Sequence, residues 1–569
     1  MSIILGINKD HSDSSACMLI DGKLIGAIAE ERLGKRIKHD SSFPTNSIKW
    51  LIKESKIRYS DIDLIAVSNN SLSNLPQKFF HSFDFSNKNL LKKIKNKIFN
   101  KSSVDKELVE LCIRNGEKEK NLKYKIYKVE HHLTHIASAY YLSRFDGITA
   151  GLSYDGSGDA VSIMLAECNN NEIKVLERVF LPTSLGHFYS AVCNFIGFEK
   201  FGEEYKVMGL SAYGEDKYSE YFNDLISYDE KQCVRQKNIF DYNSIDFKKN
   251  QIIKFNKNIF PDKKVEKFSQ ESKDIAKSLQ VTFEKIVMQI IDRLQKKVPT
   301  NNLVMAGGCA MNGLVNGKIF KESKFKNHFI QPASTDDGTA LGAAYYCWHN
   351  YLKKKERFEM KHAFWGPYYN EEEILSEIKA KNLKYEKFDN NEKLTKYAAK
   401  LISDSNVVGW YQGRCEWGSR ALGNRSILAN PAHKNMKDII NSKIKKRESF
   451  RPFAPSVLED DVKTFFECDV KSDFMNHIVK FKKEWREVFP SVCHVDYTAR
   501  LQTVSKENNL LFYQLITELK KITGYGIILN TSFNENEPIV DTPEQAINCF
   551  LRTDMDILFL EKFMISKNS

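Results

Sequence analysis

An internal repeat places the strongest constraint on the fold of this chain. Residues 6–22 parallel residues 151–165 at a constant offset of 145 residues. The positions that coincide are Gly6 with Gly151, Asp10 with Asp155 and Ser12 with Ser157. Each copy has the pattern strand, small polar turn, strand, which predicts a β-hairpin whose tip exposes backbone N–H groups and hydroxyls. Two such tips, suited to holding a phosphate, predict a duplicated α/β domain.

The predicted duplication resembles the actin, sugar-kinase and Hsp70-like superfamily, in which a ligand binds in the cleft between the two halves. On this interpretation the second turn supplies Gly156 and Ser157 as candidate nucleotide ligands.

A pair of histidines four residues apart, His131 and His135, precedes an apolar stretch at 136–142 that is typical of a helix. Residues i and i+4 share one helix face, so both imidazoles can reach one cation. The zinc-protease pattern requires glutamate after the first histidine, and another histidine stands there. Asp155 and Asp336, each on a glycine-containing turn after a strand-like run, add two carboxylates. The alternative is an ordinary helix pair; the combined pattern favours a metal site.

Further glycine-rich segments predict nucleotide contacts. Residues 302–306 form an apolar strand that runs into Gly307 and Gly308, and Asn312 follows at a predicted helix start. Glycines at such a point let a phosphate approach the backbone near a helix N-terminus. Lys206, isolated among glycines, is a candidate for a phosphate or carbonyl contact; the alternative is a surface lysine in a loop.

The composition excludes several classes of protein. No apolar run approaches the roughly 18 residues that span a bilayer, and the N-terminus has the pattern of a first strand, without a signal-peptide leader. The 11 cysteines form no C-x-x-C pair. Scattered cysteines of this kind predict reduced thiols and a cytoplasmic location, with no membrane partner.

The net charge of +12 favours anionic ligands. A lysine-rich stretch at 88–101 contributes part of it and predicts either a solvated surface or a contact with nucleic acid.

A charged segment at 351–358 followed by a Gly-Pro pair predicts a domain boundary. We expect one domain at 1–355 and a second α/β domain at 370–569. The second should begin with helices at 371–382 and 394–404 and a strand at 407–412.

Four polar clusters in the second domain are rich in cationic and amide donors: 413–431, 441–455, 494–504 and 529–540. Arginine forks bind phosphate bidentately, and lysine acts as a point charge. Because these arginines lie beside Gly, Ser and Pro, a solvated helix face is the weaker interpretation. The clusters predict a polyphosphate site or a phosphate-plus-carbonyl site.

The order of these motifs across nearly the whole chain resembles the NodU/CmcH family of O-carbamoyltransferases. The first domain resembles the Kae1-like metal-and-nucleotide domain, and the second resembles YrdC. The resemblance implies an enzyme that forms carbamoyladenylate and pyrophosphate from carbamoyl phosphate and ATP, with Mg²⁺, in the YrdC-like domain. The Kae1-like domain would then transfer the carbamoyl group to an acceptor hydroxyl and release AMP.

The resemblance also assigns roles to residues. A divalent metal, Fe²⁺ above Mn²⁺ or Zn²⁺, would bind His131, His135, Asp155 and Asp336. His11 would act as general base, and Lys206 and Arg447 are further catalytic candidates. The adenylate would contact Gly307, Gly308, Asn312 and Lys206. Candidates for carbamoyl phosphate and ATP are Arg414, Arg420, Arg425, Lys445, Arg447, Arg451, Arg500, Asn530, Thr531 and Ser532.

Three positions depart from the family pattern. Ser419 replaces a proline before Arg420, Tyr497 replaces a glycine, and Asn536 replaces a glycine where asparagine tolerates a left-handed backbone. None of these changes removes a charged group, so we expect activity.

The acceptor and the oligomeric state stay open. The acceptor could be a sugar, a natural product or a hydroxymethylated base such as 5-hydroxymethylcytosine in DNA. Two alternatives to O-carbamoyl transfer are threonylcarbamoyl transfer to tRNA adenosine, which requires threonine and bicarbonate, and a non-catalytic nucleotide-binding scaffold.

Overall fold

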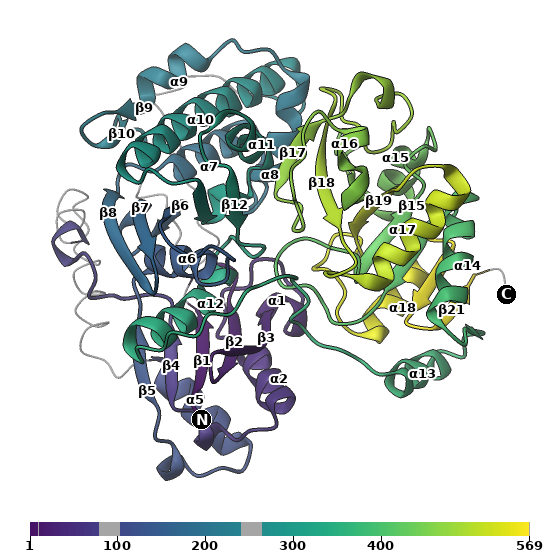
Figure 1. Ribbon diagram of the computed structural model, residues 1–569, viewed down its shortest axis with the longest axis horizontal. Coiled ribbons are helices and arrows are strands. Elements are labelled where there is room, and N and C mark those ends of the chain that lie inside the picture. Colours follow the sequence, from purple (N-terminus) through teal and green to yellow (C-terminus); the bar gives the residue numbers. More distant parts are fainter. Residues whose placement is uncertain (10, 79–102, 241–264, 568–569) are drawn as a thin grey trace. The chain divides into compact units, whose positions relative to one another are not determined.

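The computed structural model describes residues 1–9, 11–78, 103–240 and 265–567. It divides into two compact units (Figure 1). Unit 1 contains Met1–Glu30 and His39–Met360, and unit 2 contains Glu31–Lys38 and Lys361–Ser569. The division after Met360 falls between the two predicted domains. The short segment Glu31–Lys38 belongs to unit 2, whereas the predicted first domain included it.

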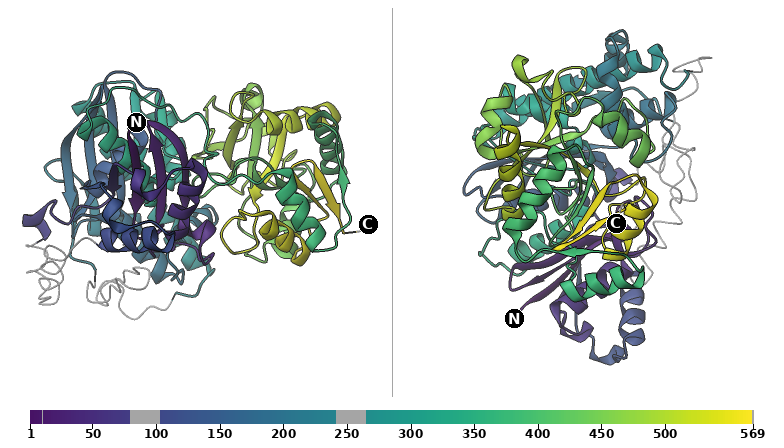
Figure 2. Two further views of the ribbon diagram at one scale, coloured as in Figure 1. Left: turned by 90° about the horizontal axis from the view of Figure 1, so that it is seen from below. Right: turned by 90° about the vertical axis from the view of Figure 1, so that its right-hand side faces the viewer.

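The first sheet of unit 1 has the strand order β3-β2-β1-β4-β5. β1, β2 and β3 are antiparallel neighbours, and β4 and β5 run parallel to β1. The bounds are β1 (Ile3–Asn8), β2 (Ser15–Ile20), β3 (Lys23–Ala29), β4 (Leu64–Val67) and β5 (Lys125–Lys128). Every residue of β1 is buried, as expected for a central strand covered on both faces. Figure 2 shows the purple strands β1 to β3 from two further directions, with the N-terminus at the start of β1.

The second sheet repeats this topology, with the order β12-β11-β6-β7-β8. β6, β7 and β8 are antiparallel neighbours, and β11 and β12 run parallel to β6. The bounds are β6 (Thr149–Gly158), β7 (Val161–Asn169), β8 (Glu172–Phe180), β11 (Asn302–Ala306) and β12 (Asn327–Ile330). The predicted duplication is confirmed, and both predicted hairpins form, as β1–β2 and β6–β7.

Two helices lie between the sheets: α6 (His131–Tyr140) packs on β6 and β11, α12 (Asp337–Tyr346) packs on β1 and β2, and they contact each other. Further α-helices with described bounds in unit 1 are α2 (Thr45–Ser55), α5 (Ser103–Arg114), α7 (Leu185–Phe195), α8 (Glu204–Leu210), α9 (Ser219–Leu225), α10 (Gln270–Lys297) and α11 (Gly313–Glu322). A small hairpin joins β9 (Ile226–Asp229) and β10 (Cys233–Gln236). α1 (Glu30–Leu33) begins in unit 1 and ends in unit 2.

Unit 2 is an α/β unit around one mixed nine-stranded sheet. In sheet order the strands are β13 (Glu386–Lys387), β21 (Phe563–Ser566), β20 (Ile557–Leu560), β14 (Val408–Tyr411), β15 (Arg425–Ala429), β19 (Ile527–Ser532), β16 (Ala454–Leu458), β18 (Thr498–Val504) and β17 (His477–Lys480). The helices are α13 (Glu371–Ala380), α14 (Asn391–Ser403), α15 (Met436–Ile439), α16 (Val462–Phe465), α17 (Leu510–Thr523) and α18 (Pro543–Arg552). Apolar residues of α14 and α17 form the main core with the sheet. The predicted α/β class is confirmed; the likeness to YrdC stays a prediction.

Within the described residues, no helix is long and apolar enough to cross a membrane. The lysine-rich stretch at 88–101 lies outside the described residues, so its interpretation as a solvated surface or a nucleic-acid contact stays a prediction.

Candidate functional site

Helix α6 brings two histidines onto one face. His131 and His135 are fully buried, and their Nε2 atoms are 3.1 Å apart. The backbone N–H of His131 donates to Asp159 in the β6–β7 turn at 3.0 Å, which ties the first turn of the helix to the second hairpin. The two imidazoles therefore lie on one face of the helix, as the i, i+4 spacing predicts.

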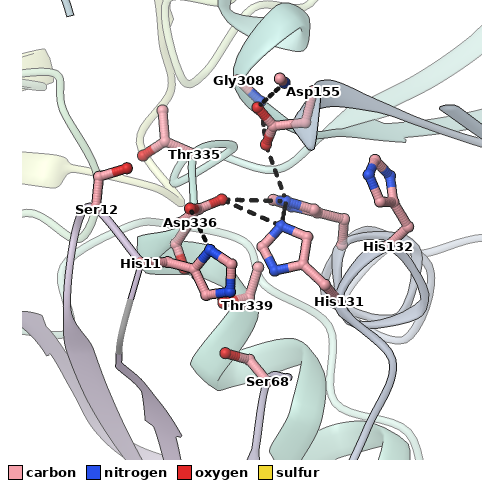
Figure 3. Close-up of polar contacts among 12 residues, drawn as sticks. His11, Ser12, Ser68, His131, His132, Asp155, Gly308, Thr335, Asp336 and Thr339 are labelled. Carbon is pink, nitrogen blue, oxygen red and sulfur yellow. Dashed lines mark hydrogen bonds and ion pairs between the residues drawn. The ribbon is translucent and has the colours of Figure 1, made fainter. Parts of the chain in front are cut away.

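Two carboxylates complete the cluster (Figure 3). Asp155, near the end of β6, places Oδ2 at 3.2 Å from Nε2 of His135. Asp336, directly before α12, places Oδ1 at 3.3 Å from Nε2 of His131 and 3.5 Å from Nε2 of His135. One ligand atom from each of the four residues lies within 4.8 Å of the others. Strands and helices from both halves of unit 1 thus converge on one point.

The histidines and aspartates of the cluster shift one another's pKa values. Burial lowers the pKa of His135, but hydrogen bonds to Asp155 and Asp336 outweigh it and raise this pKa to about 9. Burial raises the pKa of Asp336, but the neighbouring His131, His135 and His11 hold it well below its usual range. These shifts arise because the carboxylates surround the imidazoles with negative charge, as a cation at this place would require.

The donor set fits a divalent metal ion. Two imidazole nitrogens and two carboxylate oxygens suit Fe²⁺, Mn²⁺ or Zn²⁺. The 3.1 Å between the two Nε2 atoms matches two adjacent ligands with metal–nitrogen bonds of about 2.1 Å. The residues present therefore fit the metal that the family resemblance implies, without identifying it.

His132 does not belong to the cluster, and its ring points away from it (Figure 3). Its Nδ1 lies 2.8 Å from Ser153 Oγ and its Nε2 lies 2.9 Å from the carbonyl of Val161. Burial and the flanking His131 and His135 lower its pKa well below the usual value. A neutral, hydrogen-bonded imidazole here fixes α6 against the second sheet.

Glycines admit the close packing around the cluster. The N–H of Gly308 donates to Asp155 Oδ2 at 3.1 Å. Gly307 has φ +102°, and a Cβ there would lie 2.2 Å from the carbonyl oxygen of Tyr154. Both glycines therefore let their own backbone pack closely against the turn at Asp155. The sequence predicted that a phosphate would contact the backbone at these glycines.

Gly158 presses against a predicted metal ligand, which gives a testable consequence. A Cβ at this position would lie 2.0 Å from Cδ2 of the His131 ring. Gly158→Ala should therefore displace the ring, destabilise the fold by about 1–3 kcal/mol as other overpacked sites do, and weaken metal binding measured by titration. Gly151→Ala in the same strand is the control, because its Cβ would meet Ile136 at 3.0 Å and no predicted ligand. Equal metal affinity in the two variants would contradict the prediction.

His11 lies beside the cluster on the first hairpin (Figure 3). Its Nδ1 is 3.9 Å from Asp336 Oδ2, and its ring centroid is 4.8 Å from that of His131. The side chain is 22% exposed, whereas the His131 side chain is fully buried. His11 can therefore meet a molecule that enters from solvent while remaining next to the metal ligands.

Other candidates in unit 1 are already engaged. Asn312 caps α11 by accepting from the N–H of Val315 at 3.2 Å and pairs with the amide of Gln280. Lys206 lies in helix α8, which excludes the alternative of a lysine in a loop, and its ammonium is 2.7 Å from Glu203. The loop interpretation was wrong because flanking glycines do not prevent a short helix when Val207, Met208 and Leu210 are buried.

The second hairpin has a neighbour that the sequence did not indicate. Ser157 Oγ lies 3.4 Å from Nε2 of His187, which is in the first turn of α7. Ser184, the N-cap of α7, donates from Oγ to the carbonyl of Gly156 at 2.6 Å. The signal available was the Ser-Leu-Gly-His sequence, an N-cap followed by a glycine that permits close approach.

Some of the cationic candidates in unit 2 fall into two groups. In the first, Arg500 is partly buried and donates to the carbonyl of Met475 at 3.1 Å. Burial, together with the positive charge of nearby Arg420, lowers the pKa of Arg500 well below its usual value. A negative charge near these arginines would offset this effect.

The second group surrounds Lys445, which is almost fully buried. Its Nζ contacts the carbonyl and hydroxyl oxygens of Ser532 and donates to Asn534 O and Oδ1 at 2.8 and 2.6 Å. Burial and the positive charges of Arg447, Lys38 and Arg451 lower the pKa of Lys445 well below its usual value.

Several remaining candidates have structural partners. Arg425 is fully buried, with Nη1 donating to the carbonyls of Gln412, Gly413 and Asn424 and the guanidinium 3.6 Å from the Tyr411 ring centroid. Asn530 is also buried, and it donates to Ser456, Gln502 and Ala421. Arg414 and Thr531 are partly buried. These bonds hold Arg425 and Asn530 inside the sheet.

The departures from the family pattern also have defined positions. Tyr497 adopts φ +65°, is 51% exposed and packs on the guanidinium of Arg486 at 4.4 Å. Asn536 does not adopt a left-handed backbone, so the predicted tolerance of asparagine is not used there.

Comparison with known proteins identifies the class. The family model for the carbamoyltransferase N-terminus matches residues 3–345, and the model for the carbamoyltransferase C-terminus matches residues 399–567. The chain belongs to the carbamoyltransferase family and is an enzyme of that class.

Alignments with similar proteins cover nearly the whole chain. Uncharacterized protein sll1178 of Synechocystis is 36% identical over 100% of this chain and 97% of its own length. Nodulation protein NolNO of Sinorhizobium fredii is 34% identical over 99% of this chain and 80% of its own. Solved structures are more distant: full-length HypF in its phosphate- and nucleotide-bound form aligns with a TM-score of 0.32 and 14% identity over 62% of this chain and 56% of that one.

Proposed function

We propose that this carbamoyltransferase is ATP-dependent and acts in two steps, one in each unit. The observation that carries the proposal is the chemical separation of the two sites. Unit 1 contains the histidine–aspartate cluster with His11 beside it, and unit 2 contains arginine and lysine groups whose mutual repulsion an anion would relieve. A metal-supported transfer and a polyphosphate reaction require these two different environments.

In unit 2, carbamoyl phosphate would lose its phosphate to water, leaving carbamate. A carbamate oxygen would then bond to the α-phosphorus of ATP as pyrophosphate leaves, which gives carbamoyladenylate. Arg420, Arg500, Arg447, Arg451 and Lys445 would stabilise the phosphate charges. Mg²⁺ would accompany ATP as a co-substrate ion.

In unit 1, an acceptor hydroxyl would attack the carbamoyl carbon and AMP would leave. His11 would take the hydroxyl proton, a role supported by its position beside Asp336. The metal, held by His131, His135, Asp155 and Asp336, would supply a positive charge that polarises an oxygen atom in the site. Gly307 and Gly308 would allow the adenylate to approach the Asp155 turn.

The acceptor is proposed to be a hydroxylated metabolite such as a sugar or natural product, with a hydroxymethylated DNA base as the alternative. The lysines at 88–101, on which the DNA alternative depends, lie outside the described residues. An acceptor screen by mass spectrometry for the gain of one carbamoyl group distinguishes the two.

The proposal is tested by pyrophosphate exchange. Purified protein should exchange labelled pyrophosphate into ATP only when carbamoyl phosphate is present, and it should release inorganic phosphate with carbamoyladenylate. Exchange that requires threonine and bicarbonate would show the threonylcarbamoyl reaction instead, and a complete lack of exchange would show a non-catalytic scaffold.

A further inference from the structure

The segment Glu31–Lys38 is part of unit 2, although Glu30 and His39 on either side belong to unit 1. The second unit is therefore completed by residues from the first tenth of the chain. Two arginines of this segment contact the rest of unit 2: Arg32, which is 3% exposed, and Arg36, which is partly buried.

Arg32 contacts the loop that leads to Arg420. Its Nη2 donates to the carbonyl of Gly418 at 2.7 Å, and its Nη1 lies 3.7 Å from Cys415 Sγ. Burial would lower the pKa of Arg32, but Cys415 and the acidic groups nearby, Glu416 among them, raise it. The guanidinium thus stays charged while it binds the loop backbone.

Glu416 holds the other side of the same loop. Its Oε1 accepts from the N–H groups of Leu422, Asn424 and Arg425 at 2.9, 2.9 and 3.0 Å. These bonds restrain the part of the loop after Arg420, and the bond from Arg32 restrains the part before it.

Backbone hydrogen bonds hold the loop up to Trp417: the N–H of Cys415 donates to the carbonyl of Pro367 at 2.9 Å, and the N–H of Trp417 donates to that of Ala363 at 2.6 Å. Gly418, which follows, has φ +100°, and a glycine backbone has the widest choice of conformations. Ser419 is exposed and has no ring to fix its backbone as proline would. The hydrogen bond from Arg32 to the carbonyl of Gly418 therefore restrains the last part of the loop before Arg420.

We propose that Arg32 is a positioning residue for the anion site of unit 2. It holds the backbone at Gly418 in the conformation from which the chain presents Arg420. This inference rests on the proposed function, in which Arg420 and Arg500 bind phosphate groups of carbamoyl phosphate or ATP. A loosened backbone at Gly418 would leave Arg420 less well ordered, and an anion would then have to order it on binding.

The test compares Arg32 with Arg36 in the full-length protein. Arg36→Met is the matched control, because Arg36 lies in the same segment but donates its hydrogen bonds to the carbonyls of Pro538 and Ile539 and to Gln545. Binding of inorganic pyrophosphate is measured by calorimetry, and KM and kcat are measured in carbamoyl-phosphate-dependent exchange. Metal content and thermal unfolding are recorded for each variant.

Arg32→Met should weaken pyrophosphate binding by roughly 10–100-fold, the scale of a misplaced binding group, and raise KM for carbamoyl phosphate more than it lowers kcat. Arg32→Lys, which retains the charge but not the fork, should fall between Arg32→Met and wild type. Arg36→Met should bind pyrophosphate as wild type does, even if it unfolds at a lower temperature.

Equal losses of affinity in Arg32→Met and Arg36→Met would overturn the inference, because a general effect of releasing the segment would then explain both. Unchanged affinity in both Arg32 variants would overturn it as well. A wild-type protein that neither binds pyrophosphate nor supports exchange would overturn the proposed function together with this inference. If Arg32→Met does not fold, the comparison of Arg32→Lys with Arg36→Met decides.

Discussion

Replacing His131 with alanine is expected to reduce the metal content of the purified protein from near one divalent ion per chain to near zero. His131 places Nε2 at 3.1 Å from that of His135 and 3.3 Å from Asp336, so its removal takes away one of four converging ligands. The remaining imidazole and two carboxylates would bind the ion far more weakly, because it loses one of its four protein ligand atoms. Elemental analysis of both proteins, purified in parallel, measures the effect.

The adjacent histidine provides a matched control. His132→Asn removes a buried imidazole from the same helix turn, but that imidazole bonds to Ser153 and Val161 and not to the cluster. This variant should retain its metal even if its stability falls. Equal metal content in wild type and His131→Ala, or equal loss in both variants, would refute the assignment of His131 as a ligand.

The second large effect is a separation of the two half-reactions by mutation. Arg447→Ala should abolish carbamoyl-phosphate-dependent pyrophosphate release, because its guanidinium is part of the positive group around Lys445. His11→Ala should leave pyrophosphate release intact and slow carbamoyl transfer by roughly 10²–10⁴-fold, the usual scale for a lost general base. Pyrophosphate release and formation of the carbamoylated acceptor are measured on the same samples.

Lys446→Ala is the control for the loss of a positive charge. Lys446 follows Lys445 in the chain, but its exposed ammonium pairs with Glu535 at 3.1 Å. An exposed pair of this kind contributes little, so the variant should retain pyrophosphate release. If His11→Ala stopped pyrophosphate release too, the assignment of separate roles to the two units would be wrong.

Most of the confirmed predictions came from sequence patterns that span only a few residues. The repeat at an offset of 145 residues predicted two equivalent hairpins, and the sheets have the same strand order. The apolar stretch after His135 predicted α6, and the helices at 371–380 and 391–403 and the strand at 408–411 lie within three residues of the predicted bounds. Hydrophobic periodicity and turn chemistry act within a few residues, so the sequence expresses them directly.

The cationic motifs did not show how far their residues are buried. Arg425, a candidate phosphate ligand from the family resemblance, is enclosed in β15 and donates to three backbone carbonyls. Lys206, a candidate for a phosphate or carbonyl contact, lies in α8 beside Glu203. A motif shows that a cationic residue is present, but whether that residue faces a ligand or the interior depends on segments that are distant in sequence.

The sequence by itself determined the duplicated α/β plan, the family, and the pairing of His131 with His135 on one helix face, because each depends on local periodicity or on a repeat. Only the tertiary structure decided that Asp155 and Asp336 meet those histidines, since helices and strands from both halves of unit 1 must converge to bring them there. Only the tertiary structure, likewise, assigned Glu31–Lys38 to unit 2. The contact of Arg32 with Gly418 joins residues 386 positions apart, and no local pattern encodes a contact between segments so far apart in the chain.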